Sequence, residues 1–550
     1  MAKLPAPQHF YTDQGDNMTG NQPDAPQTGA EALVRTLIAG NVDTCFANPG
    51  TSEMHFVAAL DHIPGIRCVL GLQENTVTGM ADGYFRVTRR PAVTLLHCGP
   101  GYANGIANLH NARRAGSGIL NIVGDHAIPH VVHDSPLTSD VDALVGATSQ
   151  WHAFGSDPAR IGADAARGLA AASDGYGQVA SLVLPADVSW TLGGVAAVPA
   201  APQKPRPFDP LAVRKVSRAL RSDRKVLIIL GTPAVVPELH TLLMGLARDT
   251  GAVLMGSPLI SRMPMGRGRL AMPAVPYSVD VAIETLKPYD VVVLVNCPPP
   301  VGFFLYPGRP SLVQRPDAEV LVLSRENQDA AAALGALVAE LGIGPAEVPT
   351  VEGSIPEVSG PITPEGFAAV VARQLPADAI VINEALTLGG GFAAVAPFMA
   401  PSDWLTVTGG AIGGGIPLAT GAAVGAQAMG RPDRRVVTLQ ADGSAAYTLQ
   451  ALWTQARENL PVTTLLLNNR SYAILLDEFK KVGANPGPTA ASMMNLDRPA
   501  IDWSALARGF GVAAAVATTL EELDIALAQA LALDGPMLID VQFPASRAEQ

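Results

Sequence analysis

The chain has 550 residues, of which 48% are hydrophobic and 16% are charged, and its formal net charge is −12 at pH 7. A chain of this length exceeds what one hydrophobic core supports, so we expect three domains with sizeable cores. The negative net charge and the lack of a basic run argue against a nucleic-acid partner, because a phosphate backbone is bound by a basic face.

The four cysteines, Cys45, Cys68, Cys98 and Cys297, include no Cys-x-x-Cys pair. This usage favours reduced thiols and a cytoplasmic protein. The N-terminus lacks the basic-then-apolar pattern of a signal peptide. No run of about 18 uncharged apolar residues is present, so we expect no membrane span.

The order of apolar runs along the chain predicts a tail followed by three units. Residues 1–26 are polar and rich in Pro, Asn, Gln and Asp, and they are predicted to be disordered. The first unit covers residues 27–195, with strands expected at Val93–His97, Leu120–Val123 and Ala180–Leu184. Short strands alternating with helical stretches are typical of an α/β fold.

An Ala/Pro-rich linker, Ala196–Pro207, precedes the second unit, residues 208–346. Its expected strands are Lys225–Leu230, Val253–Met255, Val291–Val295 and Val320–Leu323. A second connector, Val348–Pro361, leads to the third unit, residues 361–545, with strands expected at Ala379–Ile382, Val436–Leu439, Val462–Leu467 and Met537–Val541. The pattern predicts three doubly wound, mostly parallel sheets.

Two residues of the first unit, Glu74 and His97, are candidates for a functional role. Glu74 is expected at the start of a helix, where negative charge is favoured, and by itself such a residue is commonly a capping acid. His97 ends a predicted strand just before a Gly-rich turn, which is where ligands of α/β sheets bind. A lone histidine of this kind is otherwise more often a core residue.

The stretch from Asp442 to Asn469 is the most informative part of the chain. Asp442-Gly443-Ser444 follows one predicted strand, and Asn469 follows the next strand, 27 residues later. Residues 445–459 are predicted to form the crossover helix between them, which brings both strand ends to one edge of the sheet. Oxygen donors of this kind suit Mg²⁺, and the backbone N–H groups of a helix start suit a phosphate.

This spacing resembles the thiamin-diphosphate motif, in which Gly-Asp-Gly is followed about 27 residues later by Asn-Asn. Ala441 replaces the first glycine of the motif, which is acceptable if its φ is negative. The resemblance implies that Asp442, Asn469 and the backbone carbonyl of Ser471 hold Mg²⁺. It also implies that Gly443 and Ser444 contact the diphosphate and that Tyr472 borders the cofactor; Tyr472 as core packing is an equal alternative.

The order of motifs from Thr28 to Pro544 resembles the thiamin-diphosphate enzymes that include acetolactate synthase, benzoylformate decarboxylase and the 2-hydroxyacyl-CoA lyases. The resemblance implies pyrimidine-binding, middle and diphosphate-binding domains, in that order. Glu74 matches the glutamate that bonds the aminopyrimidine ring of the cofactor. In the string Thr408–Gly415, the carbonyl of Gly410 would orient the amino group, and Ile412 would be the wedge that bends the cofactor. Leu386 and Thr387 match a turn that contacts the diphosphate.

The short sequence motifs around the candidate catalytic residues are most similar to those of benzoylformate decarboxylase. The resemblance places Thr51 at a substrate-contacting serine and His97 at a catalytic histidine. That enzyme has a second active-site histidine in its middle domain, where Phe303 or Phe304 stands here. We expect the missing acid–base group to slow protonation of the carbanion and to favour its capture by a second carbonyl.

The resemblance therefore implies a thiamin-diphosphate- and Mg²⁺-dependent decarboxylase and carboligase of 2-oxo acids, in which an enamine intermediate ligates to a second carbonyl as in acetolactate synthase. Two alternatives remain: simple decarboxylation to an aldehyde, as in benzoylformate decarboxylase, and C–C cleavage of a 2-hydroxyacyl-CoA. The tail from Pro544 offers only Arg547 to a CoA phosphate.

The implied partners are small 2-oxo acids or aldehydes and further copies of the chain. In this family Glu74 and Asp442 would meet across a subunit boundary, so a homodimer or homotetramer is implied. The middle unit has no Gly-x-Gly-x-x-Gly after a strand, and Gly231-Thr232-Pro233 interrupts the best place for it. We therefore expect no FAD.

Overall fold

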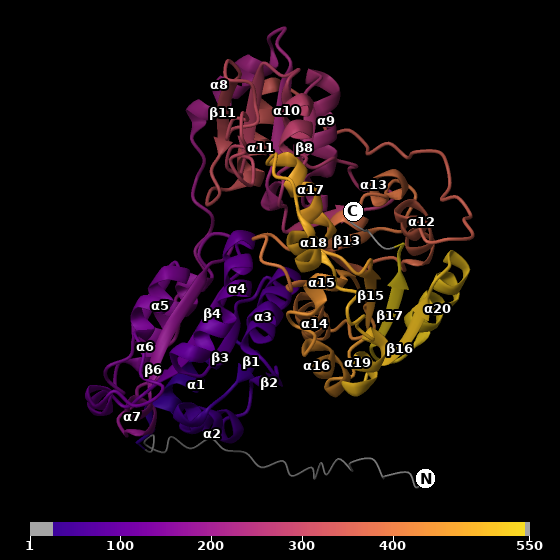
Figure 1. Cartoon of the computed structure of the whole chain (residues 1–550). Helices are drawn as coiled ribbons and strands as arrows, with labels where there is room; N and C mark the ends of the chain where they lie inside the picture. Colours follow the sequence, from indigo (N-terminus) through magenta and orange to yellow (C-terminus); the bar gives the residue numbers. More distant parts are fainter. Residues whose placement is uncertain (1–25, 545–550) are drawn as a thin grey trace.

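The computed structural model describes residues 26–544. All but the last residue of the predicted tail, residues 1–26, lie outside the described residues. The described chain contains three sheets of six, four and seven strands (Figure 1). The predicted α/β class with mostly parallel sheets is confirmed, because β9–β13 is the one antiparallel pairing between the named strands of the described chain.

The first sheet has the strand order β2-β1-β3-β4-β6-β5. Its strands are β1 (Thr44–Asn48), β2 (Arg67–Leu70), β3 (Ala92–Leu96), β4 (Ile119–Asp125), β5 (Trp151–Phe154) and β6 (Val179–Pro185). Its helices are α1 (Gly29–Ala39), α2 (Met54–His62), α3 (Glu74–Thr88), α4 (Cys98–Ala115), α5 (Val141–Thr148), α6 (Ile161–Ala172) and α7 (Ala186–Trp190), with 3₁₀ turns η1 (Thr51–Glu53) and η2 (Ile128–His133). Separate cores on the two faces explain why every residue of β3, β4 and β6 is buried.

The second sheet has the order β11-β10-β7-β8. Its strands are β7 (Val226–Leu230), β8 (Val253–Gly256), β10 (Val291–Val295) and β11 (Glu319–Ser324). Its helices are α8 (Pro210–Leu220), α9 (His240–Thr250), α10 (Val279–Leu286) and α11 (Ala330–Leu341), with 3₁₀ turns η3 (Thr232–Ala234) and η4 (Pro237–Leu239). Every residue of β10 is buried, as expected for a central parallel strand covered on both faces.

The third sheet has the order β16-β17-β15-β14-β12-β13-β9. Its strands are β9 (Arg262–Met265), β12 (Ile380–Glu384), β13 (Ser402–Thr406), β14 (Val436–Ala441), β15 (Val462–Asn468), β16 (Ala513–Ala517) and β17 (Met537–Gln542). Its helices are α12 (Pro364–Gln374), α13 (Phe392–Val395), α14 (Gly415–Ala428), α15 (Asp442–Ala445), α16 (Ala451–Arg457), α17 (Ala473–Lys481), α18 (Pro488–Met494), α19 (Trp503–Gly509) and α20 (Leu520–Ala532), with the 3₁₀ turn η5 (Leu386–Leu388). Strand β9 comes from the second unit in sequence and pairs antiparallel with β13.

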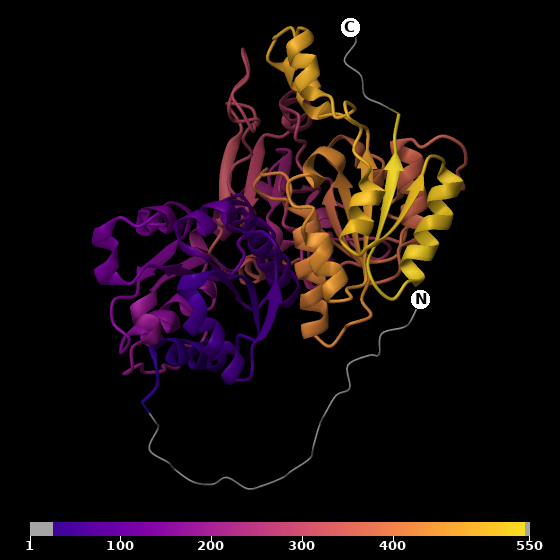
Figure 2. The ribbon, with the colours of Figure 1, turned by 60° about the horizontal axis from the view of Figure 1, so that its bottom comes forward.

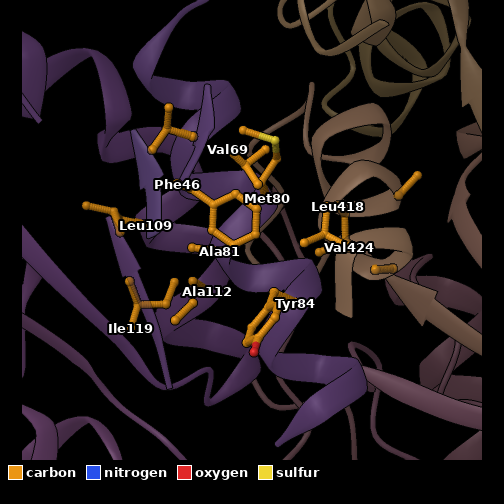
Figure 3. Packing of buried hydrophobic residues seen from close by; sticks show 14 of the residues in the cluster. Phe46, Val69, Met80, Ala81, Tyr84, Leu109, Ala112, Ile119, Leu418 and Val424 are labelled. Atoms are coloured by element: carbon orange, nitrogen blue, oxygen red, sulfur yellow. The ribbon is translucent and has the colours of Figure 1, made fainter. Parts of the chain in front are cut away.

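Helix α3 joins the first unit to the third by packing directly on α14 (Figures 2 and 3). The approach is close because both helices carry glycines: a Cβ at Gly83 would lie 2.0 Å from the carbonyl oxygen of Leu418, and a Cβ at Gly421 would lie 1.8 Å from that of Met80. Tyr84 packs in the same core. The contact places the N-terminal ends of α3 and α14 side by side, so the ligand-binding edges of the first and third sheets adjoin.

Buried polar groups support this arrangement. Arg86 on α3 is 2% exposed and is bonded by both carboxylate oxygens of Asp82, at 2.7 and 2.6 Å. It also donates to the carbonyl of Thr406 at 2.5 Å and to that of Ser261 at 3.2 Å. One charged and satisfied side chain therefore ties α3 to segments of both other units.

The predicted helix over residues 445–459 is wrong in its extent. Helix α15 ends at Ala445, a turn follows, and α16 begins at Ala451. The Thr448 hydroxyl in this turn donates to the carbonyl of Gly413 at 2.6 Å, so the chain turns here to hold a neighbouring loop. Within residues 26–544, no helix is both long and apolar enough to cross a membrane.

Candidate active site

His97 lies at the end of β3 with its ring held by a buried carboxylate. Its Nδ1 is 3.0 Å from Oε2 of Glu53, whose side chain is fully buried, whereas the His97 side chain is 22% exposed. Glu53 also accepts a 2.7 Å hydrogen bond from the N–H of Gly50 and one from the hydroxyl of Ser52. A carboxylate oxygen accepts a hydrogen bond, so the contact fits the ring tautomer with its proton on Nδ1 and Nε2 as an acceptor.

Cys98 follows His97 in a left-handed conformation with φ of 53°, which is uncommon for a residue with a side chain. Its Sγ lies 3.3 Å from the Ser52 hydroxyl and 3.7 Å from Nδ1 of His97. Burial raises the pKa of the Cys98 thiol to about 11, although the Ser52 hydrogen bond lowers it. The thiol is therefore neutral at neutral pH. Glu53, His97 and Cys98 together form a cluster of the kind that can hold a metal ion.

Glu74 is the first residue of α3, as predicted, and Gln73 caps the helix by accepting from the N–H of Thr76. The Glu74 carboxylate is half-buried and accepts a hydrogen bond from Nδ2 of Asn104 at 3.1 Å. A Cβ at Gly101 would lie 3.2 Å from Oε1 of Glu74, so α4 packs closely against this carboxylate.

Thr408–Gly415, the glycine turn, connects β13 to α14. Gly410 has φ of 76° and Gly413 has φ of 90°, which only glycine adopts without strain. The turn contacts α4 of the same chain: Asn111 Nδ2 donates to the carbonyl of Ala411 at 2.8 Å, and its Oδ1 accepts from Gly409 N at 3.1 Å. Ile412 is half-buried.

Asparagines connect the helix of Glu74 to this turn. The Oδ1 of Asn75 accepts from the N–H of Asn108 at 2.8 Å, and Oδ1 of Asn108 accepts from Nδ2 of Asn111 at 2.9 Å. The structure thus brings the helix start that carries Glu74 toward the glycine turn within one polypeptide.

Glu384, at the end of β12, was missed by the sequence analysis as a functional residue. Its carboxylate is 3% exposed and accepts from the N–H groups of Gly413 and Gly415, both at 2.7 Å, and from Nε2 of Gln440 at 3.0 Å. Burial raises its pKa, while these hydrogen bonds lower it. Nε2 of Gln440 also lies 2.5 Å from the hydroxyl of Ser444, so one network joins the glycine turn to the Asp442 motif.

Asp442 and Asn469 follow neighbouring parallel strands, with Ala441 opposite Leu467 in the register. Ala441 has φ of −67°, so alanine fits the position of the motif glycine. The Asp442 carboxylate accepts from the N–H groups of Gly443 and Arg470, each at 2.7 Å. Burial raises its pKa to about 6, and a bound cation would offset the cost of charging it there.

The remaining predicted residues surround this edge of the third sheet. Oδ1 of Asn469 accepts from the N–H of Ser471 at 3.1 Å, so the two proposed metal ligands belong to one tight turn. The ring of Tyr472 covers Gly443, where a Cβ would lie 2.4 Å from the ring. Leu386 has φ of 49° and is exposed, as is Thr387, and both follow β12 at the same edge.

Phe303 and Phe304 are distinguished by their surroundings. A Cβ at Gly410 would lie 3.5 Å from the ring of Phe303, which also packs on Tyr277 with ring centroids 4.7 Å apart. Phe304 is 65% exposed. Phe303 is therefore the aromatic residue of the middle unit that faces the glycine turn.

The comparisons with known proteins agree with this geometry. Residues 27–144 match the N-terminal TPP-binding domain of thiamine pyrophosphate enzymes, and residues 389–541 match the C-terminal TPP-binding domain. A Mycobacterium tuberculosis protein named "Putative acetolactate synthase large subunit IlvX" is 44% identical over 94% of this chain and 99% of its own length. Benzoylformate decarboxylase of Pseudomonas aeruginosa is 30% identical over 94% and 98%.

A solved structure has the same fold. The thiamine diphosphate-dependent 4-hydroxybenzoylformate decarboxylase of Rhodococcus jostii RHA1 superposes with a TM-score of 0.81, at 23% identity over 95% of this chain and 100% of its own length. Two TPP-binding domains in this order define an enzyme that uses thiamin diphosphate to make or break C–C bonds. The chain belongs to the thiamine pyrophosphate enzyme family, and the predicted family is confirmed.

The residues present suit the cofactor and a divalent cation. The Asp442 carboxylate and the Asn469 amide offer hard oxygen donors at one sheet edge, which is the chemistry that Mg²⁺ prefers. Gly443 and Ser444 follow Asp442 at the start of α15, so backbone N–H groups of a helix start lie at the same sheet edge as the carboxylate. A buried carbonyl oxygen, Oδ1 of Asn468, also stands without a partner beside this turn.

Proposed function

We propose that this protein is a thiamin-diphosphate- and Mg²⁺-dependent decarboxylase and carboligase of 2-oxo acids that joins the acyl fragment to a second carbonyl, as an acetolactate synthase does. The observation that carries this choice is Phe303 against the glycine turn, because it offers no proton to the reacting fragment. The 44% identity to the M. tuberculosis protein supports the same choice.

Two parts of the chain would hold the cofactor. Asp442, Asn469 and the carbonyl of Ser471 would bind the cation, and Gly443 and Ser444 would donate backbone N–H groups to the diphosphate. Leu386 would contribute its backbone and Thr387 its hydroxyl. Tyr472, packed on Gly443, would border this site.

The reactive end would be held by the first unit and the glycine turn. Glu74 would bond the pyrimidine ring, the carbonyl of Gly410 would orient its amino group, and Ile412 would force the bent conformation. When bound, thiamin diphosphate supplies the carbon nucleophile and the electron sink. Glu384 would keep Gly410 and Ile412 in place through its bonds to the turn.

His97 would move protons at the substrate oxygen, with Thr51 beside it. Glu53 fixes one ring nitrogen, so the other can accept a proton from a substrate hydroxyl and return it. Simple decarboxylation, as in benzoylformate decarboxylase, is the second candidate, because that relative is 30% identical and His97 remains available to protonate the fragment.

We also propose a cytoplasmic homodimer or homotetramer with active sites at subunit interfaces. The four free cysteines of the described chain suit a reducing compartment. The domain limits given above, residues 27–195, 208–346 and 361–545, are proposed as the functional units, with Mg²⁺ and no FAD bound.

The deciding experiment is calorimetry followed by product analysis. We expect the purified protein to bind thiamin diphosphate with Mg²⁺ and to lose that binding in EDTA or in Asp442→Ala. The loaded protein should convert pyruvate to acetolactate more readily than it converts benzoylformate to benzaldehyde. Glu74→Gln should lower kcat by about 10²–10⁴-fold. Full activity of that variant, or no uptake of the cofactor, would disprove the assignment.

A further inference from the structure

A cavity of about 360 Å³ opens beside His97 in the first unit. Its walls follow the C-terminal ends of four parallel strands, the edge at which α/β sheets bind ligands. Thr51 and Ser52 follow β1, His97 and Cys98 follow β3, His126 and His130 follow β4, and Ala186 and Trp190 follow β6. The volume lies in the range of small-molecule pockets.

The wall contributed by the segment after β4 carries a row of histidines. The ring centroids of His126 and His130 are 5.8 Å apart, and those of His130 and His133 are 5.7 Å apart. His126 and His130 line the cavity. One ring nitrogen of His126 lies 3.2 Å from the Ser135 hydroxyl, which leaves its other nitrogen for a ligand.

Three carboxylates near this wall each accept at least one hydrogen bond, and one of them, Asp125, also interacts electrostatically with His126. Glu53 is fully buried and bonded to His97, Ser52 and the N–H of Gly50. Asp125 is 6% exposed and accepts from the N–H of His126 at 2.8 Å. Asp187, on α7, accepts from the N–H of Ile128 at 3.1 Å.

The cavity lining therefore carries histidine nitrogens and hydroxyl groups but no carboxylate side chain. The lining residues include no lysine or arginine, so the histidines are the only lining side chains that can carry a positive charge. Neighbouring imidazoles repel each other when both are charged, and an anion between them relieves that repulsion. His97 is already assigned to the reacting carbonyl, whereas the proposed function gives His126 and His130 no task.

We propose that His126 and His130 bind a second carboxylate group in the His97 pocket. This inference rests on the proposed function, because it adds a specificity site to the same reaction. The group could be the distal carboxylate of a dicarboxylic 2-oxo acid donor, or the carboxylate of a second 2-oxo acid that acts as acceptor. In either case the histidines recognise an oxyanion by hydrogen bonds from ring N–H groups.

Calorimetry on the enzyme loaded with thiamin diphosphate tests the site without turnover. Glutarate serves as an unreactive dicarboxylate, and pentanoate is its monocarboxylate control. We expect glutarate to bind at least tenfold more tightly than pentanoate. His130→Phe, which keeps an aromatic ring but no N–H, should remove this difference.

The matched control is His133→Phe, which changes the third ring of the same row outside the cavity lining. It should keep the preference for glutarate. Binding of glutarate and pentanoate that is equally tight in the unaltered enzyme and in His130→Phe would overturn the inference, as would loss of the preference in both variants. Neither result depends on catalysis, so failure of this site is distinguishable from failure of the proposed function.

Kinetics then identify the source of the carboxylate. If the donor supplies it, kcat/KM for 2-oxoglutarate should exceed that for 2-oxopentanoate, and His130→Phe should lower this ratio at least tenfold. If the acceptor supplies it, the enzyme should use pyruvate in preference to acetaldehyde as acceptor. His130→Phe should then lower the ratio of the rate with pyruvate to the rate with acetaldehyde. If His130→Phe changes neither the donor ratio nor the acceptor ratio, the inference is overturned.

Discussion

Glu384 and Gly413 are joined by a 2.7 Å hydrogen bond from the backbone N–H of the glycine to Oε1 of the buried carboxylate. The second oxygen accepts in the same way from Gly415, two residues later. A single side chain at the end of β12 thereby fixes the turn that carries Gly410 and Ile412. Gln440 extends the network to Ser444, so the two proposed ends of the cofactor site share one rigid support.

Glu384→Gln tests this support. The amide of this variant keeps one acceptor oxygen, but its NH₂ group would face a backbone N–H of Gly413 or Gly415. One hydrogen bond to a charged group would be lost, and such a bond contributes about 1.5–3 kcal/mol. We expect kcat at saturating cofactor to fall about 10- to 100-fold, with a smaller change in the Kd of thiamin diphosphate. The exposed Glu365→Gln is the control and should match the unaltered enzyme. Equal kcat for both variants would show that Glu384 does not position the turn.

Glu53→Gln tests the partner of His97. The amide oxygen of this variant could still accept a hydrogen bond from Nδ1, but the side chain would lack the negative charge that stabilises a protonated ring. We expect kcat/KM to fall about tenfold or more, while calorimetry shows unchanged cofactor binding. Ser52→Ala, which leaves the Glu53–His97 pair in place, should have the smaller effect. If Ser52→Ala lowered kcat/KM more than Glu53→Gln, the essential contact would be the one at Ser52.

The Cys98 thiol should react with iodoacetamide only at high pH. Its pKa is raised to about 11, chiefly by burial, so the reactive thiolate is scarce at pH 8. The alkylation rate should rise about tenfold for each pH unit until it levels near pH 11. Ser52→Ala removes a hydrogen bond that lowers this pKa and should slow the reaction further at a given pH. Peptide mass spectrometry measures the rate, and rapid labelling at pH 8 would contradict the expectation.

Mixing two inactive variants tests whether the sites are shared between subunits. If Glu74 of one subunit serves Asp442 of another, a dimer of Glu74→Gln with Asp442→Asn contains one intact site and one doubly altered site. Random reassembly should then restore about a quarter of the unaltered activity, by the arithmetic of closed twofold dimers. In the structure α3 packs on α14 of the same chain, so no restoration would mean that each site is completed within one polypeptide.

The parts of the fold that sequence reasoning found share one physical signal. The predicted strands Val436–Leu439 and Val462–Leu467 lie within β14 and β15, in which every residue is buried, and parallel pairing places the ends of these strands together. The strand that begins at Arg262 was missed because it has four residues, only one of them fully buried, and because it joins a sheet far away in sequence. Strand β16 was missed because four of its five residues are alanine.

The candidate site likewise contains residues that the sequence predicts and residues that it does not. Asp442 and Asn469 were predicted because each follows a recognisable strand at a fixed spacing. Glu384 gave no comparable signal, since a glutamate at a strand end is ordinary until its two glycine partners are placed around it. Which of Phe303 and Phe304 faces the turn likewise depended on packing, which no local pattern encodes.

Gly83→Ala tests the contact between α3 and α14. The added Cβ would lie 2.0 Å from the carbonyl oxygen of Leu418, which is backbone and cannot rotate away, so the helices would have to separate. Overpacking of this kind costs about 1–3 kcal/mol, and we expect a lower Tm together with weaker cofactor binding. The control is Gly335→Ala in α11, where a Cβ meets no atom within 4 Å. That variant should be slightly stabilised, by about 0.4–1 kcal/mol, because alanine favours the helix. If Gly83→Ala were as stable as Gly335→Ala, the close packing of α3 on α14 would not be the contact that holds the first unit against the third.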